Sequence, residues 1–397
     1  MIVGIVGKPS SGKSTLFNAA TMQDVPMAAY PFTTIEANKA VGFVRVECVD
    51  KEFNVQCNPR SGFCHNHIRY VSIEIIDVAG LVPGAHEGKG MGNQFLSDLS
   101  RADILIHVVD ASGSTNEKGE AISAGSYDPS KDVEFLEEEI DLWFFGILEK
   151  NWPKFARTAF ESKAKLVSSM AQNLSGIGAT EDIIDHVLLE LSLTDKKLAL
   201  WTEDEKRAFA KKFREKSKPT IIAANKADMP QSKPNIEALS KKFPGKIIIP
   251  CSGIAELTLK RAAKDGAIDY VQGEADFKIL KELSEKQNLG LEYIRTNVLQ
   301  KFNSSGVQQV LETAVFDVLK YIAVFPGGTK GLVDSQGRTL PDVFLMPPKS
   351  TALDFAYKLH TDFGKNFIKA INVKNRQLIG KEHELKNRDV VEIVHSA

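Results

Sequence analysis

The sequence predicts an α/β fold in which a doubly wound, mainly parallel sheet carries a helical insertion and is followed by a small C-terminal domain. Short apolar runs rich in β-branched residues alternate with helical patterns through residues 1–110. This alternation is typical of parallel sheets whose strands are joined by crossover helices. The interval 111–224 is far too long for one crossover helix, so it must hold the insertion.

The strands of the predicted sheet are marked by apolar runs. We expect His107, inside one of these runs, to be a core or edge residue rather than a catalyst. The runs lie at 1–6, 71–76, 104–110, 220–224 and 247–249.

Residues 126–216 carry the helical insertion. Apolar residues recur at a spacing of three or four between Val133 and Leu148, and again within 182–193. Thr202 and Glu205 form a capping-box pattern, which predicts that a helix begins there. The aromatic residues of this region are expected to form a core between the helices.

From about residue 321, short strands surround one helix, which we expect Ser350 to cap. Strand patterns lie at 343–347, 368–373, 377–379 and 390–394. The predicted domains are therefore a discontinuous domain of 1–125 and 217–320, the insertion 126–216, and the C-terminal domain 321–397.

The pattern Gly7-x-x-x-x-Gly12-Lys13-Ser14 follows the first strand and precedes a helical pattern. In this setting, backbone N–H groups converge on one place, which suits the phosphates of a nucleotide. We expect Lys13 to reach the β- and γ-phosphates and the Ser14 hydroxyl to hold Mg²⁺. A glycine- and serine-rich turn without nucleotide is the alternative. The predicted phosphate-binding set is completed by Ser10, Ser11, Gly12 and Thr15.

A guanine-binding motif is predicted at Asn225, Lys226 and Asp228, directly after a buried-strand pattern. The Asp228 carboxylate can accept hydrogen bonds from N1–H and the 2-amino group of guanine. Adenine lacks both donors, so it would leave this acceptor unpaired. Ser252 and Gly253 follow the next strand pattern, and we expect them to offer backbone N–H groups to the guanine O6.

Two further segments predict a metal-dependent switch. Asp77 ends a strand pattern and would hold Mg²⁺, and the Gly80 N–H would meet the γ-phosphate. Thr33 and Thr34 lie between the first two strand patterns, where a threonine can close over the nucleotide. We expect Thr34 to be the Mg²⁺ ligand.

These motifs together resemble the Obg-related GTPases, and the overall plan is similar to the YchF subfamily in its archaeal type. The resemblance rests on the P-loop and on residues 32–38, 77–96 and 225–228. The C-terminal region resembles a TGS domain, a ubiquitin-like β-grasp module. The resemblance implies a GTP- and Mg²⁺-dependent switch whose partner is the ribosome, tRNA or other RNA, contacted by the helical insertion and the TGS domain.

The sequence departs from the family at two places. Ser10 stands where the family usually has an asparagine linked to potassium-stimulated hydrolysis, so that property is not carried over. Many YchF proteins prefer ATP and have a changed guanine motif, whereas Asn225 to Asp228 is intact here. We therefore expect GTP, with an ATP-preferring hydrolase as the alternative.

Hydrolysis is expected to be slow. Leu81 occupies the place of the water-orienting glutamine of Ras-like GTPases, and its side chain forms no hydrogen bonds. His86 is the nearest ionisable candidate to assist catalysis, and Glu87 is the next. A solvated loop histidine is the other interpretation of His86. A nucleotide-gated RNA-binding protein, in which turnover is incidental, is a rival from another functional class.

The bulk composition excludes few functions. The chain has 397 residues, a net charge of −1 and no apolar stretch near the roughly 20 residues of a membrane span. We expect a cytoplasmic, monomeric protein without a signal peptide. The region from Tyr321 has 11 Lys and Arg against 8 Asp and Glu, an excess that permits RNA contact without requiring it.

The cysteines leave three interpretations open. Cys57, Cys64 and His67, with Cys48 upstream, could form a small metal site, although their spacing is not a standard zinc pattern. Cys57 and Cys64 could instead form a disulfide, which in a cytosolic protein is expected only of a hyperthermophile. Unpaired thiols on a surface excursion between two strands are the third interpretation.

Overall fold

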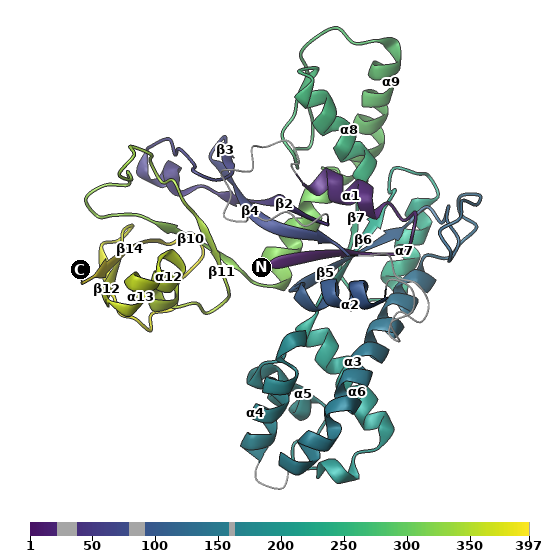
Figure 1. Ribbon diagram of the computed structural model, residues 1–397. Coiled ribbons are helices and arrows are strands. Elements are labelled where there is room, and N and C mark those ends of the chain that lie inside the picture. Colours follow the sequence, from purple (N-terminus) through teal and green to yellow (C-terminus); the bar gives the residue numbers. More distant parts are fainter. Residues whose placement is uncertain (22–37, 79–91, 159–162, 397) are drawn as a thin grey trace. The chain divides into compact units, whose positions relative to one another are not determined.

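The computed structural model describes the chain except residues 22–37, 79–91, 159–162 and 397 (Figure 1). It divides into two compact units. Of the described residues, the first unit comprises those within 1–20, 38–40 and 74–310, and the second comprises Thr21 and those within 41–73 and 311–396. Among the described residues, no helix combines the length and the apolar character needed to cross a bilayer.

The larger sheet is mainly parallel and has the strand order β2-β4-β1-β5-β6-β7, with β3 paired antiparallel to β4. The pairs β4–β1, β1–β5, β5–β6 and β6–β7 are all parallel. Every residue of β5 is buried, as expected of a parallel strand covered on both faces. The predicted doubly wound sheet is thereby confirmed. The strands are β1 (Ile2–Val6), β2 (Lys39–Glu47), β3 (Phe63–His65), β4 (Ile68–Asp77), β5 (Ile104–Asp110), β6 (Thr220–Asn225) and β7 (Ile248–Pro250).

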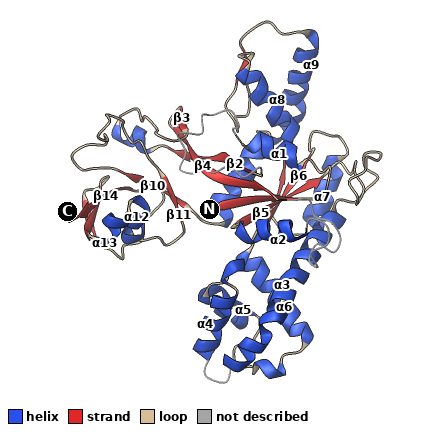
Figure 2. Cartoon of the chain, viewed as in Figure 1, coloured by secondary structure: helices blue, strands red, loops and turns tan. Residues whose placement is uncertain are grey.

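Helices lie beside this sheet, and further helices follow its last strand, β7, in the chain (Figure 2). Two π-helical segments, Arg295–Leu299 and Thr313–Val318, follow α9 and α11 directly. A short two-stranded sheet joins β8 (Ile268–Asp269) to β9 (Lys278–Ile279). The helices are α1 (Lys13–Ala20), α2 (Gly92–Arg101), α7 (Ser232–Lys242), α8 (Gly253–Lys264), α9 (Glu285–Ile294), α10 (Gln300–Phe302) and α11 (Val307–Glu312).

The inserted region folds as helices that share a core with the sheet. One cluster of buried residues runs from Val6 and Leu105 in the strands to Phe144 and Phe213 in the helices. This shared core explains why the helices fall into the same compact unit as the sheet. The capping box of Thr202 and Glu205 begins α6 as the sequence predicts. These helices are α3 (Ser130–Thr158), α4 (Lys163–Asn173), α5 (Glu181–Glu190) and α6 (Glu203–Ser217).

The second unit contains a five-stranded sheet in the order β11-β10-β14-β12-β13. The buried Phe355 of α12 belongs to the same core cluster as Val324 and Val391 of this sheet, which is a β-grasp arrangement. Its elements are β10 (Ile322–Pro326), β11 (Phe344–Met346), α12 (Ala352–Leu359), α13 (Thr361–Lys365), β12 (Phe367–Asn372), β13 (Gln377–Ile379) and β14 (Val390–His395).

The cap of α12 is Thr351, not Ser350 as the sequence pattern predicts. The Thr351 hydroxyl accepts a hydrogen bond from Asp354 N, and the Asp354 carboxylate accepts one from Thr351 N at 2.8 Å. This reciprocal pair satisfies two backbone donors that would otherwise be unpaired at the start of the helix. Ser350 instead donates its hydroxyl to Pro347 O, in the turn that precedes the helix.

Residues 41–73 also belong to the second unit, where two arginines attach them. Arg45 forms an ion pair with Glu312, with 2.6 Å between Nε and Oε1. Arg69 is fully buried, and its Nη2 donates hydrogen bonds to the carbonyl oxygens of Leu340 and Pro341. The excursion between β2 and β4 is therefore held to the C-terminal region by charged and hydrogen-bonded contacts.

His107 should make stability depend on pH. It is buried in β5, and burial, followed by the charges of Lys246 and Lys8, lowers its pKa to about 3. Between roughly pH 6.5 and 3, the unfolded chain binds a proton that the folded chain does not, so stability falls as the pH falls. The expected slope is up to about 1.4 kcal/mol per pH unit. Urea unfolding of the wild type and of His107→Gln from pH 7 to 4 would measure it. Equal slopes in the two proteins would contradict this prediction.

Candidate nucleotide-binding site

The loop between β1 and α1 has the backbone geometry of a phosphate-binding loop. Gly7 and Gly12 have φ of 153° and 93°, and Ser10 has φ of 59°. A Cβ at Gly7 would lie 2.5 Å from Val108 O, so no side chain fits there. The loop thus passes against β5 and turns into α1, whose first residue is Lys13. The N-terminal N–H groups of α1 therefore face the region that the sequence assigns to phosphates.

Asn225 joins this loop to the segment that follows β7. Its Nδ2 donates to Ser11 O at 3.0 Å, and its Oδ1 accepts from Gly253 N at 3.0 Å. A Cβ at Gly12 would lie 2.2 Å from Asn225 Nδ2, so glycine is required for this close approach. The buried Asn225 side chain, at the end of β6, therefore fixes the phosphate-binding loop and the start of α8 relative to each other.

Lys226 is in the left-handed region, with φ of 61°. Its Nζ donates to Asp110 Oδ2 at 2.9 Å and to Ser114 Oγ at 3.2 Å. Burial alone would raise the pKa of Asp110, but hydrogen bonds from groups that include Ser112 and Lys226 outweigh it and hold the pKa below its usual value. The Lys226 stem is therefore fixed across the site by a buried carboxylate.

Asp228 has an oxygen that suits guanine. Its Oδ1 is buried and, in the part of the chain that the structure describes, has no hydrogen-bond partner. The backbone oxygen of Asp228 accepts a hydrogen bond from Tyr293 Oη at 3.0 Å, which fixes the turn. A buried carboxylate oxygen without a donor is costly unless a ligand supplies one. The N1–H and 2-amino groups of guanine would do so.

Ser14 and Asp77, the two described residues that the sequence predicts as metal ligands, contact each other through their side chains. Ser14 Oγ donates to Asp77 Oδ2 at 3.4 Å, while Asp77 Oδ1 is buried and lacks a partner among the described residues. Burial raises the pKa of Asp77, although the nearby Lys13 opposes this. A desolvated carboxylate oxygen beside a hydroxyl is a donor set that fits Mg²⁺, and Ser14 and Asp77 are the described residues that would hold the ion.

Ser252 and Gly253 lie at the start of α8, where the Ser252 hydroxyl accepts from Ala255 N. Their own N–H groups already have acceptors, because Ser252 N donates to Ser305 O and Gly253 N to Asn225 Oδ1. A contact of these groups with the guanine O6 stays a prediction. The geometry gives this segment a second role, which is to brace Asn225.

Some of the remaining predicted site residues are described by the structure, and others are not. Ser10, Ser11 and Thr15 lie in the loop and at the start of α1, where Ser11 is fully buried. The other predicted site residues are outside the described residues, namely Thr33, Thr34, Gly80, Leu81 and His86.

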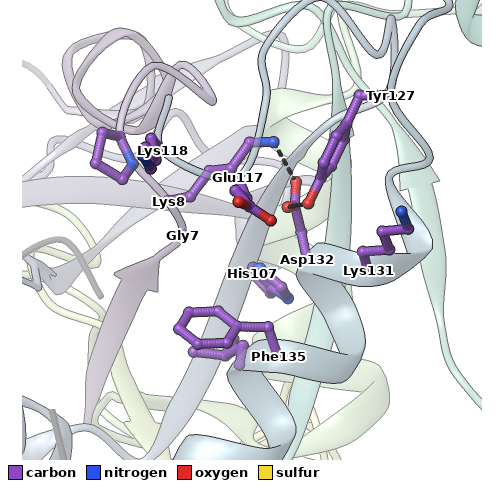
Figure 3. A pocket seen from close by; sticks show the side chains of 11 residues that line it. Gly7, Lys8, His107, Glu117, Lys118, Tyr127, Lys131, Asp132 and Phe135 are labelled. Carbon is purple, nitrogen blue, oxygen red and sulfur yellow. Dashed lines mark hydrogen bonds and ion pairs between the residues drawn. The ribbon is translucent and has the colours of Figure 1, made fainter. Parts of the chain in front are cut away.

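A cavity of about 420 Å³ lies beside the loop (Figure 3). The described residues that line it include Gly7, Lys8 and Pro9 but neither Lys13 nor Ser14. Lys8 Nζ forms a buried ion pair with Asp132 Oδ2 at 2.9 Å and lies 3.9 Å from the centroid of the Tyr127 ring. This cavity is therefore adjacent to the predicted phosphate site and separate from it.

Sequence reasoning missed Asp110 and Asp132. Asp110 accepts hydrogen bonds from Lys226 and from three hydroxyl groups, and Asp132 pairs with Lys8. Asp110 stands at the end of a strand run, where a carboxylate often has a function, and that was the one available signal. Asp132 lies in the first turn of α3, where acidic residues are common without a specific partner.

The sheet order, the loop and the guanine motif together define a P-loop GTPase fold. A family model described as "50S ribosome-binding GTPase" matches residues 2–136. A second, described as "Obg-like GTPase YGR210-like, G4 motif-containing domain", matches residues 223–327, and a "TGS domain" model matches residues 336–395.

Known proteins resemble the chain over its whole length. It is 46% identical to an uncharacterized GTP-binding protein of Methanocaldococcus jannaschii, over 100% of this chain and 99% of that protein. A crystal structure of a GTP binding protein from Pyrococcus horikoshii OT3 has a TM-score of 0.78 and 38% identity, with 100% of both chains covered. A Ribosome-binding ATPase YchF of Buchnera aphidicola is 27% identical over 98% of this chain and 92% of that protein. The chain belongs to the Obg-like GTPases of the YchF type.

Removing the Asp132 charge should destabilise the first unit. Asp132→Asn would leave the buried Lys8 ammonium without its counter-ion, at a cost of about 3–5 kcal/mol. Urea unfolding would measure the loss. The matched control is Asp269→Asn, the same substitution at an exposed position on β8. A double variant Lys8→Met/Asp132→Leu should recover most of the stability, because it removes both charges. If Asp132→Asn is as stable as the control, the ion pair has no structural importance.

Proposed function

We propose that this protein binds GTP with Mg²⁺ and hydrolyses it slowly, as a nucleotide-controlled switch that acts on the ribosome. The observation that carries the proposal is the buried Oδ1 of Asp228, which has no hydrogen-bond partner among the described residues, in a chain that also has a phosphate-binding loop. Asn225 ties the two together through Ser11, so that base and phosphate recognition share one rigid frame.

The choice of GTP over ATP follows from donors and acceptors. Asp228 offers acceptors only, and guanine presents two donors toward such a group. Adenine has an acceptor at N1 and no 2-amino group, so it would leave Asp228 Oδ1 unpaired. Sites that bury a polar group in this way discriminate by roughly 10⁴-fold. The fixed Lys226 stem would lie along the base and exclude water from it.

Hydrolysis would depend on positioning and charge. Lys13 and the loop N–H groups would hold the β- and γ-phosphates, and Ser14 and Asp77 would hold the metal ion. Mg²⁺ would supply charge stabilisation to the leaving phosphate oxygens. Leu81 offers no hydrogen bond to the attacking water, so turnover without a partner would be slow. His86, or a group of the partner, would have to assist.

An ATP-preferring hydrolase is the second candidate. It is favoured by the name of the Buchnera relative, "Ribosome-binding ATPase YchF". That protein is only 27% identical, and the intact Asn225 to Asp228 motif supports guanine here. The name of the Buchnera relative also supports the ribosome as partner. So does the "50S ribosome-binding GTPase" description of the family model that matches residues 2–136. The TGS domain and α3–α6 would supply contact surfaces.

Competition binding would test the choice of base. Wild type should bind GTP far more tightly than ATP, and Asp228→Asn should lose at least about 100-fold in GTP affinity, because hydrogen bonds to a charged acceptor contribute about 1.5–3 kcal/mol each. Asp269→Asn serves as the control and should bind GTP like the wild type. Tighter binding of ATP than of GTP by the wild type would overturn the assignment of Asp228.

Co-sedimentation with ribosomes would test the partner. We expect association with a non-hydrolysable GTP analogue and weaker association with GDP. Turnover of the isolated protein should lie below about 0.01 per second and rise when ribosomes are added. A loss of association in every nucleotide state would remove the ribosome from the proposal and leave GTP binding standing. Turnover of about ten per second by the isolated protein, which is the order of partner-stimulated GTPases, would contradict the slow switch.

A further inference from the structure

Three thiols and a carboxylate gather in the second unit, whereas the described nucleotide motifs belong to the first. Cys48 follows β2, Asp50 lies in the 3-10 helix Val49–Phe53, Cys57 lies in the next loop, and Cys64 is on β3. One potential ligand atom from each of the four lies within 4.8 Å of the other three. Cys48, Asp50 and Cys57 are buried, and Cys64 is half-buried.

The distances fit a shared metal ion better than a disulfide. Cys48 Sγ lies 3.6 Å from Cys57 Sγ. A disulfide would need about 2.05 Å, and all four cysteines of the chain are free thiols. Two thiolates on one tetrahedral zinc ion, each bonded at about 2.3 Å, lie about 3.8 Å apart. Cys57 and Cys64 are both free thiols, so the disulfide interpretation of this pair is not supported. Cys48 and Cys57 already stand at the spacing of two ligands.

The backbone holds this cluster from several sides. Asn66 and His67, with φ of 49° and 62°, form the tight turn between β3 and β4. His67 O accepts from Cys48 N at 2.7 Å, which brings the end of β2 against this turn. Cys57 N donates to Asp50 Oδ2 at 3.2 Å. Protein hydrogen bonds alone thus bring the end of β2, the Cys57 loop and the β3–β4 turn close together.

His67 takes a different place from the one that the sequence spacing suggests. Its Nδ1 lies 2.9 Å from Asp50 Oδ1, so it contacts the carboxylate instead of standing among the four ligand atoms. Histidine–carboxylate contacts of this kind orient metal ligands in many sites. Cys48 and Asp50 therefore complete the ligand set, and His67 positions Asp50.

The surroundings can balance the charge of such a site. Three thiolates and a carboxylate around a divalent ion leave a net negative charge. The buried Arg69 guanidinium has no hydrogen-bond partner for Nε and Nη1 within the described chain. The Arg69 charge interacts with the Cys57 thiol, so it can offset part of this negative charge.

The segment has little apolar core of its own, although ion pairs of Glu52 and Arg60 hold it to the C-terminal region. From Asp50 to Gly62 it is mainly polar, and Phe53 and Val55 are only half-buried. Short segments without a core of their own are often held by metal ions. Thiolate-rich, closed, four-coordinate sets are typical of structural zinc, because zinc accepts sulfur and oxygen ligands without a geometric demand of its own.

We propose that Cys48, Asp50, Cys57 and Cys64 bind one zinc ion, which holds the excursion between β2 and β4 in its folded form. The ion would have no vacant position for a substrate, so its role is structural. The ion would link the end of β2, the loop that carries Cys57 and strand β3 at a single point.

Metal analysis of the full chain tests this proposal. The reduced wild type should contain one zinc per chain, and a mercurial reagent that modifies thiols should release it. Cys57→Ser should lose the zinc. Cys251→Ser removes the one cysteine outside the cluster, which is also buried, and should keep the zinc. His67→Gln should keep the stoichiometry but lower the zinc affinity about 10–100-fold.

Cobalt substitution of the wild type tests the site without any variant, in case Cys57→Ser does not fold. Co²⁺ should give thiolate charge-transfer bands together with the strong visible absorption of a tetrahedral site. Chelated protein should be cut by trypsin after the exposed Arg60 at least ten times faster than zinc-loaded protein. Absence of both zinc and cobalt–thiolate bands in reduced, metal-supplied wild type would overturn the proposal. Retention of zinc by Cys57→Ser, or its loss in Cys251→Ser, would also overturn it.

Discussion

The candidate site depends on the two hydrogen bonds of the Asn225 side chain. One reaches Ser11 O in the phosphate-binding loop, and the other accepts from Gly253 N at the start of α8. Because amide donor and acceptor are both used, the side chain has one orientation, and Gly12 leaves it the necessary room. The loop, the guanine motif and the segment after β7 are consequently set relative to one another before any nucleotide binds.

Buried charges extend this frame into the helical insertion. Asp110 holds Lys226, while Asp132 of α3 holds Lys8 of the phosphate-binding loop. Each carboxylate is expensive to bury and is compensated by an ammonium group and by hydroxyl donors. Lys8 therefore couples the loop to the first turn of α3. A rearrangement of the loop around phosphate would act on α3 through this contact.

Local patterns predicted the parts of the molecule that local chemistry decides. The strand runs, the loop glycines and the capping box of Thr202 and Glu205 all appear where the sequence places them. The cap of α12 shows the limit of such prediction, because Ser350 and Thr351 are adjacent and both are residue types that cap helices. Thr351 is the cap because Asp354 can return its hydrogen bond. The ion pairs of Asp110 and Asp132 could not be recognised in the same way, because their lysine partners are distant in the chain.

The sequence by itself determined the parallel sheet, the phosphate-binding loop, the guanine motif and the C-terminal β-grasp domain. Each of these follows from periodicity or from a short motif that acts through its own backbone. Only the tertiary structure decided that Lys226 pairs with Asp110, 116 positions away. It also decided that Cys48 and Asp50, rather than His67, stand with Cys57 and Cys64. Side-chain partners across such intervals are chosen by the packing of strands and turns, which no local pattern encodes.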